Sequence, residues 1–336
     1  MKRKPLIGIV LAITFVAALA GLRFWLHRPA PPAKTTVDEA SPNVAAPSAP
    51  PFHAVKLVTV TGTPSPGPSM KGGLAVTDWS VVQTIVDTGA AYPTRLNAIR
   101  SLSGHLTDED WAVLQPFLLK PDGLDKGQLG QVVKNELLDA LCAQNPPPAG
   151  LGDVLTRMYR DQQQNKVIRD YAVQHLPPYY EQLTLQPGNA ETEQAVQNVL
   201  WEAVNETSDS IGGTALLALQ RLSQQNPGVD QGKIATTALQ MARDNNASEL
   251  AHITAFQVCA QLGTADALPV VLQAAQNGET IPVRMSAIGA LGLLGGTREI
   301  PFLNSVLAGT EDRLKPAAQR ALEQITTRQT QLASRK

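Results

Sequence analysis

The sequence predicts an all-α fold, an α-solenoid of about seven helical hairpins. The first observation is an internal repeat: residues 249–279 align without a gap on residues 281–311 at an offset of 32, which places Leu262-Gly263 on Leu294-Gly295. The second is composition, since 43% of the residues are hydrophobic but only 4% are aromatic. Self-similarity at this period, with small apolar side chains, is typical of hairpins that bury their apolar faces on one another.

The N-terminal residues 1–28 have the pattern of a membrane signal anchor. A basic start, MKRK, precedes an apolar run from Leu6 to Leu22, and RFWLHR follows. With these flanks the run reaches about the 20 residues that a helix needs to cross a bilayer, so residues 5–26 are expected in the membrane. The basic start predicts a single-pass inner-membrane protein with a cytoplasmic N-terminus and a periplasmic repeat domain. The alternative is a signal peptide cleaved near Ala18-Leu19-Ala20.

Residues 29–74 are predicted to be a disordered linker rich in Pro, Ala, Ser and Thr. Ten prolines occur between residues 29 and 70, and such a segment cannot bury enough apolar surface to offset the entropy of ordering it. Within the linker, Phe52–Thr63 shows β-branched alternation. This stretch either docks on the solenoid as an extended strap or is unstructured, and both alternatives remain open.

The repeat domain is predicted to span residues 75–328, followed by a polar tail at 329–336. The second helix of each hairpin carries a small or apolar residue that we call the anchor. The anchors are Ala98, Leu137, Ala172, Ala215, Ala255, Ala287 and Ala318. First helices are expected between them. The longest loop is expected at Pro177–Asn189, because Pro and Gly stop helices, and it would expose Tyr179 and Tyr180.

Several of these runs resemble HEAT repeats, especially the short bacterial kind also seen in phycobilisome-lyase-type proteins. The likeness lies in the run PVRMSAIGALG at residues 282–292 and in a proline inside the following first helix, at Pro269 and Pro301. The resemblance implies an α-solenoid that binds other proteins. It also permits an alternative function, a lyase-type factor or one that assists chromophore attachment.

Three positions before the anchor, six of the seven hairpins carry a basic side chain. We call these residues the ladder: Arg95, Lys134, Arg169, His252, Arg284 and Lys315, with Gly212 as the exception. One interpretation is a basic ladder along a binding groove. The structural interpretation is favoured, because this position lies about 60° from the buried centre of the helix, in the seam between hairpins. In HEAT-like families the matching Arg braces neighbouring repeats, so the resemblance implies the same role here.

The predicted partner-binding surface is the side of the second helices that faces away from the core. Its candidate residues are Arg100, Asp139, Gln174, Leu217, Ile253, Gln257, Met285, Gly289, Gly292 and Arg320. Two glycines inside one helix cost about 1 kcal/mol each relative to Ala, which indicates that something approaches this backbone closely. A bound peptide is one explanation, and a tightly packed neighbouring helix is the other.

Charge and motif content argue against several other functions. Residues 1–34 carry six Lys/Arg and no acid, which leaves 22 basic and 29 acidic side chains in the rest, so nucleic acid is not an expected partner. The five histidines lack metal-ligand spacing, and no catalytic set or cofactor is predicted. Cys142 and Cys259 are expected in the core. The predicted function is therefore a non-catalytic, membrane-tethered scaffold that binds a protein or peptide outside the cytoplasm.

Overall fold

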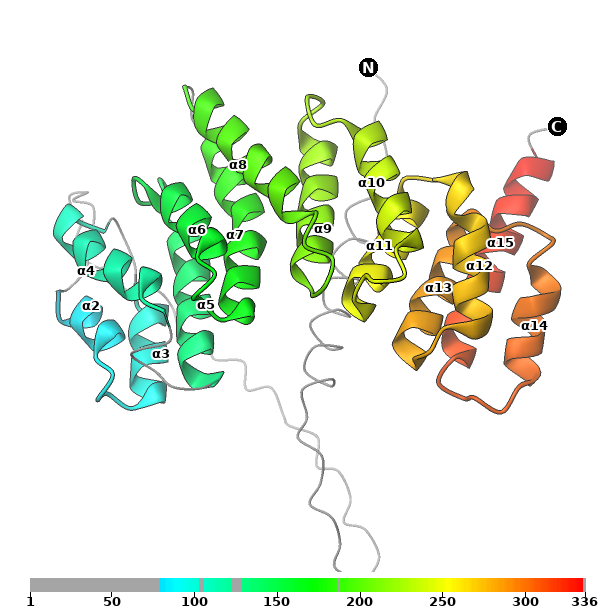
Figure 1. Ribbon diagram of the computed structural model, residues 1–336, viewed down its shortest axis with the longest axis horizontal. Helices are drawn as coiled ribbons and strands as arrows, with labels where there is room; N and C mark the ends of the chain where they lie inside the picture. The colour runs from blue at the N-terminus through cyan, green and yellow to red at the C-terminus, as the bar shows by residue number, and fades with distance from the viewer. Residues whose placement is uncertain (1–78, 103–105, 122–127, 186–187, 335–336) are drawn as a thin grey trace, which may run out of the picture. The chain divides into compact units, whose positions relative to one another are not determined.

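A computed structural model describes residues 79–102, 106–121, 128–185 and 188–334 (Figure 1). These residues form fourteen α-helices and one short 3-10 helix, and they contain no β-strand. The all-α prediction is therefore confirmed for this part of the chain. None of the helices in these ranges combines the length and the hydropathy of a membrane span. The predicted membrane helix, the linker and Phe52–Thr63 lie outside the described residues.

The helices pair in chain order into seven hairpins. The first helices are α2 (Trp79–Val86), α4 (Asp108–Leu119), α6 (Leu151–Arg160), α8 (Ala190–Ala203), α10 (Gln231–Arg243), α12 (Leu268–Asn277) and α14 (Ile300–Ala308). The second helices are α3 (Tyr92–Arg100), α5 (Gln128–Cys142), α7 (Lys166–Thr184), α9 (Ile211–Gln225), α11 (Glu249–Gln261), α13 (Ile281–Leu294) and α15 (Lys315–Ala333). The 3-10 helix η1 (Ala265–Ala267) leads into α12.

The second helices form a continuous layer. Each one packs on the next, from α3 through α5, α7, α9, α11 and α13 to α15. The first helices lie on one side of this layer, where α2, α4, α6 and α8 pack in sequence and α10 packs on α12 (Figure 1). All seven anchors are buried, which confirms the helical register predicted from the repeat. Small anchor residues let the second helices approach one another closely.

Local sequence signals explain where the helices begin. Thr107 and Asp110 form a reciprocal capping box at the start of α4. Ser248 caps α11 through the Ala251 amide, and proline occupies the first turn of α12 to α15, where its missing N–H costs nothing.

The prediction of a loop at Pro177–Asn189 is wrong, because α7 continues through Pro177 and Pro178 to Thr184. An interior proline costs a helix about 3 kcal/mol. Four large side chains on this stretch are buried, and full burial contributes about 1.5–3 kcal/mol for each, which can offset two prolines. They are Leu176, Tyr179, Tyr180 and Leu183. The predicted exposure of the tyrosine pair is therefore also wrong.

Candidate functional site

The accessible side of the second-helix layer presents one residue from each helix. We call these residues, two positions after each anchor, the outer row. They are Arg100, Asp139, Gln174, Leu217, Gln257, Gly289 and Arg320, and each is exposed or half-buried. Because consecutive second helices are in contact, the outer row runs across all seven hairpins without a gap. Met285 lies beside it on α13 with 36% of its surface exposed.

Two of the predicted partner-binding residues do not lie on this surface. Ile253 is only 6% exposed, because α13 packs over it and Ser286 donates a hydrogen bond to its carbonyl oxygen at 3.0 Å. Gly292 is buried against α15, where an added Cβ would lie 2.9 Å from the Ala321 Cα. The close approach at Gly292 therefore comes from a neighbouring helix of the same chain.

The charge of the outer row changes along the stack. Arg100 and Arg320 are exposed cations near its two ends, and the four residues from Gln174 to Gly289 are uncharged. Asp139 is paired: its Oδ1 lies 2.9 Å from Nε2 of the buried His175, whose Nδ1 lies 2.7 Å from the Tyr171 carbonyl oxygen. This pair joins α5 to α7. The middle of the row therefore suits an uncharged or apolar segment of a partner.

The ladder residues bind the first helix of their own hairpin. Five of them donate a hydrogen bond to a backbone carbonyl at or near the C-terminal end of that helix. The bonds run from Arg95 Nε to Ile85 (2.8 Å), Lys134 Nζ to Lys120 (2.6 Å), Arg169 Nε to Tyr159 (2.6 Å), His252 Nε2 to Asp244 (2.9 Å) and Arg284 Nε to Ala275 (3.3 Å). These carbonyls lack a partner within their helix, and a basic group there also complements the helix dipole.

Contacts across the seam between hairpins add to this pattern at two ladder positions. The Arg95 guanidinium lies 5.4 Å from the ring centre of Phe117 in the next hairpin. Arg169 reaches Glu206 of the next hairpin at 2.8 Å. Lys315 instead pairs with Asp312, just before its own helix. The ladder therefore joins the two helices within five of the hairpins and, at Arg95 and Arg169, joins neighbouring hairpins as well.

Replacing Arg284 with Ala should lower the melting temperature. The substitution leaves the Ala275 carbonyl without its side-chain donor, which we expect to cost about 1 kcal/mol. The melting temperature can be followed by helical circular dichroism. Arg298→Ala is the matched control, since Arg298 is exposed and lies outside the outer row. An unchanged melting temperature together with lost partner binding would contradict the structural role of the ladder.

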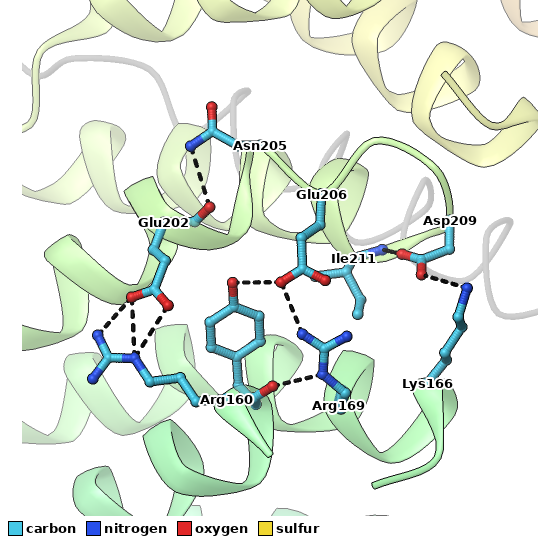
Figure 2. Close-up of polar contacts among 9 residues, drawn as sticks. Arg160, Lys166, Arg169, Glu202, Asn205, Glu206, Asp209 and Ile211 are labelled. Carbon is cyan, nitrogen blue, oxygen red and sulfur yellow. Dashed lines mark hydrogen bonds and ion pairs between the residues drawn. The ribbon is translucent and has the colours of Figure 1, made fainter. Parts of the chain in front are cut away.

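The loop between α8 and α9, residues 204–210, contacts the hairpins before and after its own. On one side Glu206 Oε1 accepts hydrogen bonds from Tyr159 Oη at 2.7 Å and from Arg169 Nη2 at 2.8 Å. Asp209 also pairs with Lys166 at 3.4 Å (Figure 2). These contacts fix the loop to the α6–α7 hairpin.

The same loop is fixed to the α10–α11 hairpin. Ser248 donates its amide to the Thr207 carbonyl at 2.7 Å and its hydroxyl to the Asp209 carbonyl at 2.6 Å. The loop also explains the exception in the ladder. A Cβ at Gly212 would lie 2.6 Å from the Glu206 carbonyl oxygen, so no basic side chain fits there. Sequence reasoning missed this junction, and the missing ladder residue was its one visible signal.

Both cysteine side chains are buried. Burial, with a smaller contribution from the charge of Asp139, raises the pKa of Cys142 to about 12, and burial raises that of Cys259 to about 12 as well. Because the thiolate is the reactive form, we expect iodoacetamide to label neither thiol in the native chain at about pH 8 and to label both after unfolding. Mass spectrometry measures the labelling. Fast native labelling would show that these core positions are open.

Within the described residues, no three His, Cys, Asp or Glu side chains are grouped so that they could hold a metal ion.

Comparison with known proteins places HEAT repeats in this chain. Residues 235–323, from α10 to α15, match the protein-family model described as HEAT repeats. This part of the chain therefore consists of HEAT repeats, in agreement with the resemblance seen in the sequence. The rest of the described chain continues the same layers. No curated protein matches the chain.

Two solved structures are similar at low identity. Human deoxyhypusine hydroxylase in complex with glycerol is 18% identical, with a TM-score of 0.33, over 74% of this chain and 95% of that one. An engineered protein is 16% identical, with a TM-score of 0.39, over 74% of this chain and 97% of that one. At these values neither similarity carries an argument about the function of this chain.

Proposed function

We propose that this protein is a membrane-tethered scaffold that binds another protein outside the cytoplasm. The proposal assigns binding to the HEAT-repeat stack and attachment to residues 5–26. It assigns no catalytic group and no cofactor.

The observation that carries the proposal is the outer row. Seven helices in continuous contact offer one accessible residue each, so a single extended or helical segment could touch several hairpins at once. Repeat stacks of this kind bind through such long surfaces. The uncharged middle of the row, with Leu217 and Gln257, favours a peptide segment over a phosphate backbone.

The remaining support comes from the sequence. The apolar run near the N-terminus follows a basic start, and the Pro-rich stretch after it would hold the repeats away from a membrane surface. For this part of the proposal, a protease added to intact spheroplasts should digest the repeat domain. Digestion only after the membrane has been permeabilised would contradict the exported orientation.

The binding face can be tested by site-specific photo-crosslinking in the native membrane. A photoreactive phenylalanine analogue at Gln174 or Leu217 probes the outer row. The same analogue at Asn198 of α8 or Thr236 of α10, both exposed on first helices, is the matched control. We expect the two row positions to give the same adduct and the two controls to give none. Equal adducts from both faces, or adducts from the controls alone, would contradict the proposal.

A further inference from the structure

We propose that the accessible side of α7, α9 and α11 binds an extended, uncharged segment of a partner protein through the main chain of that segment, with Gln220 at the centre of the contact. The inference rests on the proposed scaffold function, because it names the chemistry of the segment that the outer row binds. It also adds to the binding surface a residue that lies outside the outer row.

Gln220 is the starting point, because its side-chain amide has no partner in the chain. The residue is only 5% exposed, and its amide forms no hydrogen bond within the part of the chain that the structure describes. Both amide atoms keep some contact with solvent, whereas the unpaired Oδ1 of Asn135 is fully enclosed. A nearly buried amide without a partner destabilises a fold, so an apolar residue would suit this position better. A ligand that bonds to the amide explains its presence.

The repeat places Gln220 beside α11, next to the outer row. In hairpin six the same position, five residues after the anchor, is Gly292, and a Cβ there would lie 2.9 Å from the Cα of Ala321 on the following second helix. Gln220 therefore faces its own following second helix, α11, which carries Gln257. On α9 it comes one helical turn after Leu217, so the two side chains are neighbours.

Glutamines occur on this side of three consecutive second helices. They are Gln174 on α7, Gln220 on α9 and Gln257 on α11, and α9 packs on both of the other helices (Figure 1). Gln174 and Gln257 belong to the outer row and are half-buried. A side-chain amide carries both a donor and an acceptor, as a peptide unit does, so each glutamine can bond to an N–H and a C=O of a passing main chain.

The spacing of the helices suits an extended ligand. Packed helices lie about 8–10 Å apart, and a polyproline II segment completes one turn of three residues in about 9 Å. Such a segment, laid across α7, α9 and α11, therefore presents the same edge of its backbone to each helix. It has no internal hydrogen bonds, so its peptide groups are available to the three glutamines.

The surroundings of the glutamines favour an uncharged segment. The outer row carries no charge from Gln174 to Gly289, and Leu217 offers an apolar contact between the outer two glutamines. A charged side chain placed there would lose water without gaining a partner of opposite charge. The chemistry of this surface therefore fits a run of apolar and small polar residues.

Replacing Gln220 with Leu in the full-length chain tests whether the amide lacks a partner in the free protein. Leu has a similar size and no polar atom, so we expect the melting temperature in detergent to rise by about 2–4 °C. Gln240→Leu is the matched control, since Gln240 is exposed on α10 and should leave the melting temperature unchanged. A lower melting temperature for Gln220→Leu would show that the amide is already satisfied within the chain, and would overturn the proposal.

Binding is tested with the segment that the protein itself selects. A photoreactive phenylalanine analogue at Leu217 attaches that segment in the native membrane, and mass spectrometry identifies it. A synthetic copy of the segment is then the probe, and fluorescence anisotropy measures its affinity for the full-length chain in detergent. We expect Gln220→Leu to weaken binding at least about fivefold, and N-methylation of the probe's backbone to weaken it similarly, since each removes hydrogen bonds. Gln240→Leu should bind as wild type does.

The outcomes separate this inference from the scaffold function. An attached segment that is charged or comes from a second copy of this chain would overturn the inference, as would equal affinity for the N-methylated probe. Undiminished affinity of Gln220→Leu for the probe would contradict main-chain recognition and leave the scaffold function intact. No adduct from either Gln174 or Leu217 in the otherwise wild-type chain would contradict both proposals.

Discussion

Replacing Arg169 with Ala should lower the free energy of unfolding by about 3 kcal/mol, since breaking a buried ion pair by removing one partner costs on that order. The guanidinium is buried, donates to the Tyr159 carbonyl at 2.6 Å and to Glu206 at 2.8 Å, and lies 5.3 Å from the Tyr159 ring centre. Without it, a carbonyl and a carboxylate lose their donors where two hairpins meet. Urea unfolding followed by circular dichroism measures the loss.

Arg160→Ala is the matched control for this prediction. Arg160 lies one residue after Tyr159 and pairs with Glu202 through several hydrogen bonds, yet its side chain is 54% exposed. Exposed pairs contribute about 0–1 kcal/mol, so this variant should unfold almost like wild type. Equal losses for the two variants would show that burial at the α8–α9 loop does not set the stability of the stack.

Substituting the two glycines of α13 should shift stability in opposite directions. An Ala Cβ at Gly292 would lie 2.9 Å from the Ala321 Cα and closer still to the Gln324 side chain, so α15 must shift. Overpacking of this kind costs about 1–3 kcal/mol. Gly289→Ala meets no atom within 4 Å and should stabilise the monomer by up to about 1 kcal/mol, through helix propensity.

The melting temperatures of the two glycine variants, measured at low protein concentration, decide this prediction. Gly292→Ala should melt below wild type and Gly289→Ala at or above it. The reverse order, or a loss of stability for both, would mean that α13 and α15 do not pack as described.

The sequence alone was sufficient for the all-α architecture, because the repeat forces the same apolar positions inward in every hairpin. All seven anchors are buried, even in hairpins two to four, where the resemblance to HEAT repeats is weak. Six of the seven outer-row residues are polar or small, all except Leu217, and such residues mark an accessible face. Composition and periodicity in the sequence indicate which residues are buried. In a stack of hairpins, those buried positions repeat from one hairpin to the next.

Other features depend on contacts between distant residues, which periodicity does not contain. The Pro177-Pro178 pair suggested a loop, but the burial of Tyr179 and Tyr180 against neighbouring helices keeps α7 intact. Ile253 and Gly292 have the helical phase of surface positions, and only the neighbouring helices α13 and α15 cover them. The α8–α9 loop joins residues about 40 positions apart in the chain, as the Ser210 to Asp170 bond at 2.7 Å shows.

Substituted-cysteine accessibility along the second helices tests the central claim most directly, namely that these helices form one layer with an accessible row and a buried set of anchors. Single Cys residues would replace each outer-row residue and each anchor in turn, and their native labelling rates would be compared at low protein concentration. We expect fast labelling at all seven row positions and slow labelling at all seven anchors. An anchor that labels as fast as the row residue of its own hairpin would contradict the stack.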